Sequence, residues 1–240
     1  MKTFKKQFLP LAIGIAALAG FEIEIFRPSW YFYILIGLIF LSFIASFFEQ
    51  KSFSPAVFFQ KFLLIFLFFL GIWTMFLYLE SAFIRQALAA LGAGFVAARF
   101  RFLGDAVREP EIEFLFMVFT AFFSAAAIFG LDLFFNINTE YLAAVSFLPG
   151  ILLIYGMARE KGGPVDWGTI IAGAILWSEL IFTMLMLPNG LYLGAAIAAI
   201  YIFIFGEIFY RKHFAQKAEL KLVIFALILS LILFLTARWT

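Results

Sequence analysis

The sequence contains no cysteine and only one histidine, His213. Without a thiol the chain forms no disulfide and no metal–thiolate site, and one imidazole does not suffice for a histidine-based metal centre. Familiar catalytic signatures are also missing: there is no Walker loop, no Gly-x-Ser-x-Gly, no His-Glu-x-x-His and no paired-Asp motif of prenyl- or phosphatidyl-transferases. We therefore expect no cofactor.

Charged residues are scarce as well, at 13% of the 240 residues. Soluble domains carry about 25% charged residues, so this chain cannot cover itself with a water-soluble surface. It also lacks the extended basic region by which proteins bind nucleic acid, and no nucleic-acid partner is expected. The lipid bilayer remains as the surroundings, with membrane lipids as the predicted partners.

Apolar residues, by contrast, make up 65% of the chain, and 37 residues are phenylalanine. They form nine stretches with almost no charge, and a membrane-spanning helix needs about 20 such residues. The sequence therefore predicts an all-α fold: a polytopic transmembrane helical bundle of about nine spans, in a single membrane-embedded domain covering residues 1–240. The nine stretches are approximately 8–26, 30–48, 57–79, 81–98, 114–132, 141–157, 167–187, 190–209 and 221–237.

The positively charged residues indicate how the helices are threaded. If the N-terminus is placed inside, Arg27, Arg85 and Arg238 fall outside, and the other fourteen of the 17 Lys and Arg residues fall inside. Such residues concentrate on the cytoplasmic side of membrane proteins. The prediction is a multi-pass protein of the bacterial inner membrane, with its N-terminus inside and its C-terminus outside.

The N-terminal segment also resembles a secretory signal. Lys2, Lys5 and Lys6 precede an apolar core, and Ala-Leu-Ala at 17–19 matches an A-x-A cleavage pattern. We interpret the segment as an uncleaved first helix, because small residues are common in transmembrane helices. An intact mass that lacks residues 1–19 would contradict this interpretation.

Small residues spaced four apart indicate where helices pack, because they let helix backbones approach closely in lipid. The fourth, seventh and eighth stretches carry such pairs, and we expect them to form the packed centre, with the fifth close by. The second, third and ninth stretches are mostly Phe, Leu and Ile and are expected at the periphery. The small pairs are Ala89/Ala93, Ala90/Gly94, Gly168/Ala172 and Gly194/Ala198.

Glu179 is an acid in the middle of an apolar stretch. It lies two residues from Trp177, the centre of the stretch, and thus about 3 Å from the membrane midplane. An ionised acid there costs about 2.5–3.5 kcal/mol, so the side chain is expected to be protonated, paired or facing water. Ser178 and Thr183 are candidate hydrogen-bond donors, and Arg85 is the candidate counter-charge. One interpretation is a proton-, cation- or substrate-handling site; the other is a protonated acid in one interhelical hydrogen bond.

The segment 99–113 is the densest polar region and is predicted to be a loop at the inner face. Carboxylates of this kind bind Mg²⁺, and arginines bind phosphate headgroups. The alternative is a solvated connector whose charges neutralise one another. The candidate residues are Arg99, Arg101, Asp105, Arg108, Glu109, Glu111 and Glu113.

Two family resemblances rest on short motifs. Residues 110–116, Pro-Glu-Ile-Glu-Phe-Leu-Phe, resemble the Pro-x-Glu-Glu-x-x-Phe-Phe motif of membrane-embedded lycopene cyclases, with Glu113 as its second acid. Ile112 replaces the first acid, and the upstream Trp-Asp and a second motif copy are missing. The C-terminal third resembles polytopic bacterial membrane proteins of no known activity, and this resemblance implies no activity. It is carried by Trp177, Leu187, Pro188 and residues 236–239.

Three functional hypotheses follow. The first is a small transporter- or channel-like protein that uses Glu179, with a cavity lined by the short stretch 81–98 and by 141–157, which Pro149-Gly150 is expected to interrupt. The alternative is a non-catalytic membrane scaffold or assembly partner that binds another membrane protein through its aromatic helices and the 99–113 loop. A lipid-modifying enzyme acting through the four acids of that loop ranks below both.

Overall fold

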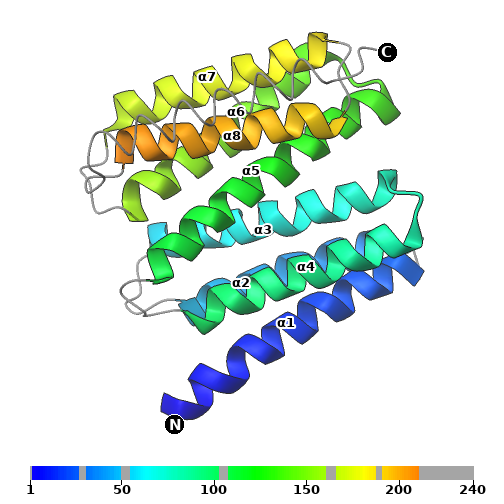
Figure 1. Ribbon diagram of the computed structural model, residues 1–240, viewed down its shortest axis with the longest axis vertical. Helices are drawn as coiled ribbons and strands as arrows, with labels where there is room; N and C mark the ends of the chain where they lie inside the picture. Colours follow the sequence, from blue (N-terminus) through cyan, green and yellow to red (C-terminus); the bar gives the residue numbers. More distant parts are fainter. Residues whose placement is uncertain are drawn as a thin grey trace. The chain divides into compact units, whose positions relative to one another are not determined.

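The protein consists of long α-helices in the computed structural model, which describes residues 2–26, 31–49, 55–102, 108–160, 166–187 and 191–210 (Figure 1). No strand occurs within these ranges, which confirms the all-α fold class for the part of the chain described. The helices are α1 (Lys2–Phe26), α2 (Tyr31–Glu49), α3 (Pro55–Tyr78), α4 (Ala82–Arg101), α5 (Arg108–Phe135), α6 (Thr139–Glu160), α7 (Trp167–Met186) and α8 (Leu191–Tyr210).

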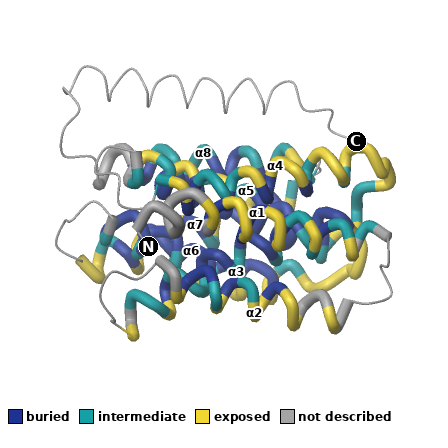
Figure 2. Tube along the Cα trace, turned by 90° about the horizontal axis from the view of Figure 1, so that it is seen from below, coloured by how far each residue is buried: buried dark blue, intermediate teal, exposed yellow. Residues whose placement is uncertain are grey.

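Within the described part of the chain, five helices are long and apolar enough to cross a membrane. Their spanning parts are Val57–Tyr78, Ala82–Arg101, Glu111–Phe135, Thr139–Arg159 and Trp167–Met186. In α1, α2 and α8 the apolar segments whose side chains the structure describes are Pro10–Ile23, Ile36–Phe47 and Leu191–Gly206. Buried and exposed residues alternate along the helices in Figure 2, as expected for helices that turn one side to protein and the other to lipid. The chain is therefore a multi-pass membrane protein whose helices contact lipid.

The eight helices coincide with the first eight predicted stretches to within a few residues at most ends. The ninth stretch, 221–237, lies outside the described residues. Nine crossings, the inside–outside orientation and the single domain therefore stay predictions.

Two predicted interruptions are wrong. Residues 99–113 are not one loop, because α4 continues to Arg101 and α5 begins at Arg108. Pro149-Gly150 does not break α6, which runs through both residues. Proline is tolerated in transmembrane helices, because neighbouring helices and local adjustments satisfy the backbone groups it frees.

The chain divides into two compact units, Met1–Phe116 and Met117–Thr240, each described by itself. In the first unit α1 packs along α4, and α2 packs along α3. A Cβ added to Gly14 would lie 2.8 Å from the Cβ of Ala97, so the missing side chain lets α1 and α4 approach. Ala89 and Ala93 are buried, as their spacing predicts, whereas Ala90 and Gly94 are exposed.

In the second unit α7 packs on α6 and on α8. Gly150 of α6 is covered by the indole of Trp177, which is fully buried. Tyr201 of α8 donates a hydrogen bond to the main-chain oxygen of Gly173, at 3.0 Å. Trp177 therefore packs deep in the contact between α6 and α7.

In the second unit, as in the first, one predicted small-residue pair is buried and the other is exposed. Gly194 and Ala198 of α8 are buried, as predicted. Gly168 and Ala172 of α7 are exposed, and the close approach occurs at the next position, Gly173.

The predicted central and peripheral helices are partly wrong. In the spanning segment of α3, 50% of the residues are buried, and the share is 61% in α5 and 56% in α6. In α4 and α7 only 33% are buried. α3 was expected at the periphery, but its large side chains fill the core, with Phe68, Phe69 and Ile72 all buried. α2 is peripheral, as predicted, since Phe40 and Phe47 are 64% and 58% exposed.

The start of α7 provides a pH-dependent contribution to stability. Asp166 is its N-cap, and its carboxylate accepts hydrogen bonds from the Thr169 hydroxyl and from the main-chain N–H groups of Gly168 and Thr169. These hydrogen bonds lower the pKa of Asp166 below its ordinary 3.8, and the bond from the Thr169 side chain has the largest effect. The stabilisation is thus present above the unfolded pKa and is lost as the pH falls through the folded pKa.

We expect Asp166→Ala to unfold at a lower temperature than the wild type at neutral pH, and this difference to shrink as the pH is lowered from about 5 to 2. Asp166→Asn is the matched control, because asparagine caps helices without titrating. Thermal unfolding in detergent micelles measures all three proteins. A difference between Asp166→Ala and the wild type that stays constant over this range would contradict the prediction.

Candidate functional site

A buried ion pair joins the end of α4 to the beginning of α5. The Arg99 Nε lies 2.7 Å from the Glu113 Oε1, and the two side chains are only 2% and 4% exposed. The guanidinium carbon also lies 4.1 Å from the ring centroid of Phe116, one turn after Glu113. Arg99 therefore receives both a carboxylate and an aromatic face, which together compensate its removal from water.

Three aromatic rings from three helices form a cluster that meets Arg99 through Phe116. The Phe116 ring lies 4.7 Å from that of Phe68 on α3 and 6.2 Å from that of Phe95 on α4. Phe68 and Phe95 stack on each other at 6.4 Å. The buried pair thus borders an aromatic cluster of the first unit, and its arrangement is suited to holding α4 and α5 together.

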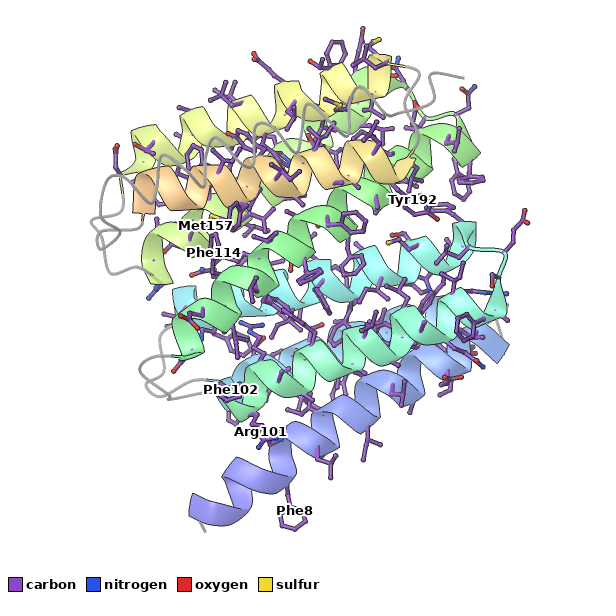
Figure 3. All side chains as sticks on the ribbon, in the orientation of Figure 1. Phe8, Arg101, Phe102, Phe114, Met157 and Tyr192 are labelled. Atoms are coloured by element: carbon purple, nitrogen blue, oxygen red, sulfur yellow. The ribbon has the colours of Figure 1, made fainter. Side chains whose placement is uncertain are left out.

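Of the other charges of the 99–113 segment, the structure describes the side chains of Arg101, Glu109 and Glu111. Arg101 is exposed at the end of α4, beside Phe102 (Figure 3), and Glu111 is exposed while Glu109 is half-buried. Asp105 and the side chain of Arg108 lie outside the described residues. Among the side chains described, no three His, Cys, Asp or Glu groups come close enough to hold a metal ion. The predicted magnesium site and acid cluster gain no support from this arrangement.

The sequence prediction missed the pairing of Arg99 with Glu113. Its signal is the apolar flank of each charge: Phe100 follows Arg99, and Phe114 follows Glu113. Both phenylalanines are buried. A charge followed by a residue that enters the core is a candidate for burial, and two such charges of opposite sign are candidates for one pair.

Glu179 is exposed and lies on the side of α7 that faces away from α6 and α8. The buried residues of α7 are Ile170, Gly173, Ala174, Trp177, Ile181 and Met184. At 3.6 residues per turn, Glu179 is about 200° around the helix from Trp177. The carboxyl group is therefore neither in a cavity enclosed by the second unit nor in its α6–α7 contact.

The predicted hydrogen-bond donors of Glu179 have other acceptors. The Ser178 hydroxyl donates to the main-chain oxygen of Ala143 on α6. The Ser146 Oγ lies 3.3 Å from the Ser178 Oγ. The Thr183 hydroxyl donates to the main-chain oxygen of Glu179 at 2.8 Å. Ser178 is instead a polar link between α6 and α7.

Arg85, the predicted counter-charge, lies in the first turn of α4, in the other unit, and is half-buried. Its pairing with Glu179 stays a prediction. No protein-family model matches the chain, and comparison with curated proteins and with solved structures gave no match. A function is therefore to be inferred from the chain's own residues.

Proposed function

We propose that this multi-pass membrane protein is a non-catalytic assembly partner that binds a transmembrane helix through the outer face of α7. The observation that carries the proposal is the exposure of Glu179 near the middle of a spanning helix. The outer face of α7 is defined as Ala172, Ile175, Glu179, Phe182 and Met186, all of which are exposed.

The spacing of these residues suits a helix contact. Successive members are three or four residues apart, so they form one strip along α7. Four of the five are apolar, and such strips pack against a second helix with side chains interdigitated. Ala172 is the smallest member and allows the closest approach of another backbone.

The carboxyl group of Glu179 makes exposure of this strip to lipid unfavourable. An ionised acid near the centre of the bilayer costs about 2.5–3.5 kcal/mol when it faces lipid. A protonated acid still gains about 0.6–2 kcal/mol from one interhelical hydrogen bond. Binding a helix that offers a polar group at this depth therefore stabilises the protein more than lipid does.

The transporter hypothesis is the alternative, and it is less well supported. A transport site needs polar groups around the acid, but Ile175, Phe182 and Met186 on the outer face are apolar, and the exposed Thr183 one turn away donates its hydroxyl to the main chain. The hydroxyl of Ser178 bonds to α6. The lipid-modifying enzyme is weaker again, since Glu113 is held in the pair with Arg99. We retain the predicted bacterial inner-membrane location as part of the proposal.

Photo-crosslinking in native membranes tests this function. A photoreactive amino acid at Met186 is expected to give a crosslinked product upon irradiation, and the same group at Phe40, exposed on α2, is the control site. Adding Glu179→Leu is expected to reduce the Met186 product about 3- to 30-fold, since one hydrogen bond in lipid contributes about 0.6–2 kcal/mol. Glu179→Leu should fold normally because the side chain is exposed.

Two results would contradict the proposal: no product from Met186, or a product of unchanged yield after Glu179→Leu. A proton flux through liposomes that depends on Glu179, without any crosslink, would favour the transporter instead.

A further inference from the structure

We infer that the outer face of α7 selects a partner helix that carries a lysine or arginine at the depth of Glu179. This inference rests on the proposed function and specifies the chemistry of the partner.

The chain itself supplies no cation at this depth. All 17 Lys and Arg residues lie near the ends of the apolar stretches or between them. Three basic residues lie furthest inside the described spans. Lys61 lies within the first two turns of α3, and Arg85 lies in the first turn of α4. Arg99, near the end of α4, is paired with Glu113. In the last stretch, 221–237, the basic residues Lys221 and Arg238 stand at its two ends. Apart from Arg85, whose pairing with Glu179 stays a prediction, a neutralising base at this depth therefore comes from another molecule.

The nearest hydroxyl groups do not replace a cation. Ser178 donates to Ala143, and Thr183 donates to the main-chain oxygen of Glu179 and not to its carboxyl group. The members of the strip one turn away, Ile175 and Phe182, bear no polar atom in their side chains. A carboxylate covered by a helix here would be cut off from water, where a charge is stable only with a counter-charge.

A second copy of the chain is the poorer occupant. Two copies of α7 packed in parallel would bring two Glu179 side chains to the same depth, and like charges in a low-dielectric environment repel strongly. A cation on a partner helix has the opposite effect, because each charge alone is costly in lipid and the two neutralise each other. The strip thus favours a basic helix and disfavours its own copy, which is discrimination by charge.

Binding of synthetic transmembrane peptides in liposomes tests the inference. The absence of cysteine allows one label to be attached at Tyr141→Cys, an exposed position at the start of α6. Three labelled Leu-Ala peptides of one length are compared, with Lys, Leu or Glu at the centre. Energy transfer is expected to show at least about tenfold tighter binding of the Lys peptide than of the Leu peptide, and the weakest binding for the Glu peptide.

Two variants show whether this preference belongs to Glu179. Glu179→Gln keeps the size and polarity of the side chain but not its charge, and should remove the preference for the Lys peptide. Thr183→Val, one turn further along and also exposed, is the matched control and should keep it. A preference that survives Glu179→Gln overturns the inference.

The remaining outcomes separate this inference from the proposed function. Equal binding of the Lys and Leu peptides, or transfer between copies of the chain that exceeds transfer to the Lys peptide, overturns the inference. If the inference fails in this way but the Met186 crosslink still depends on Glu179, the proposed function stands without a basic partner helix. If the crosslink joins Met186 to another part of the same chain, both are wrong.

Discussion

Arg99→Leu is expected to lower the free energy of unfolding by about 3–5 kcal/mol. The variant leaves the Glu113 carboxyl group, only 4% exposed, without the guanidinium that lies 2.7 Å from it. It also removes the cation from the face of Phe116. Glu113→Leu should have an effect of similar size, because it leaves the buried guanidinium without its carboxylate.

The double variant Arg99→Leu/Glu113→Leu should recover most of that loss. Replacing a buried ion pair by apolar residues of similar volume is often neutral or stabilising, since neither charge is then left in an apolar environment. The two substitutions are therefore expected to be strongly non-additive. Denaturant unfolding of the purified protein in mixed micelles measures all three variants.

Two exposed charges on the same helices serve as controls. Arg101→Leu on α4 and Glu111→Leu on α5 should change stability by no more than about 0.5 kcal/mol, because both side chains are exposed. If Arg99→Leu behaved like Arg101→Leu, or if the effects of the pair simply added, the pair would not hold α4 to α5.

The difference between the predicted loop and the observed pair has a physical cause. Helix ends were placed where charges begin, because an isolated charge cannot enter a span. That rule holds for single residues, and it fails for Arg99 and Glu113 because each neutralises the other. Residues 103–107 lie between them, and the local sequence signals the pair only through the phenylalanine that follows each charge, Phe100 and Phe114.

The depth of Glu179 was predictable, but the direction of its side chain was not. The bounds of α7 follow from the apolar run, and they place Glu179 near the middle of the helix. Two sets of small residues, Gly168/Ala172 and Gly173/Ala174, offered alternative contact faces. Which set packs depends on the surfaces opposite, Gly150 on α6 and Phe205 on α8, and these are distant in sequence.

Gly150 therefore determines which way α7 is turned, and enlarging it is expected to have the second large effect. A Cβ at Gly150 would lie 2.8 Å from the Trp177 Cδ1 and 3.3 Å from the Ala174 Cα. A ring in a filled core and a backbone atom cannot move away easily, so α6 and α7 must separate. Gly150→Leu should cost about 3 kcal/mol, the upper end for overpacking. Gly94→Leu is the matched control, because nothing lies within 4 Å of the added Cβ there.

A size exchange across the same contact tests whether the steric conflict is the reason. In Gly150→Leu/Trp177→Ala the leucine enters space vacated by the indole, and at least half of the loss caused by Gly150→Leu should be recovered. Trp177→Ala alone should destabilise, because it leaves a cavity beside Gly150. If the double variant were as unstable as the sum of the two single ones, another contact would hold α7 in its orientation. Recovery would show that the contact of the Trp177 indole with Gly150 packs α7 on α6.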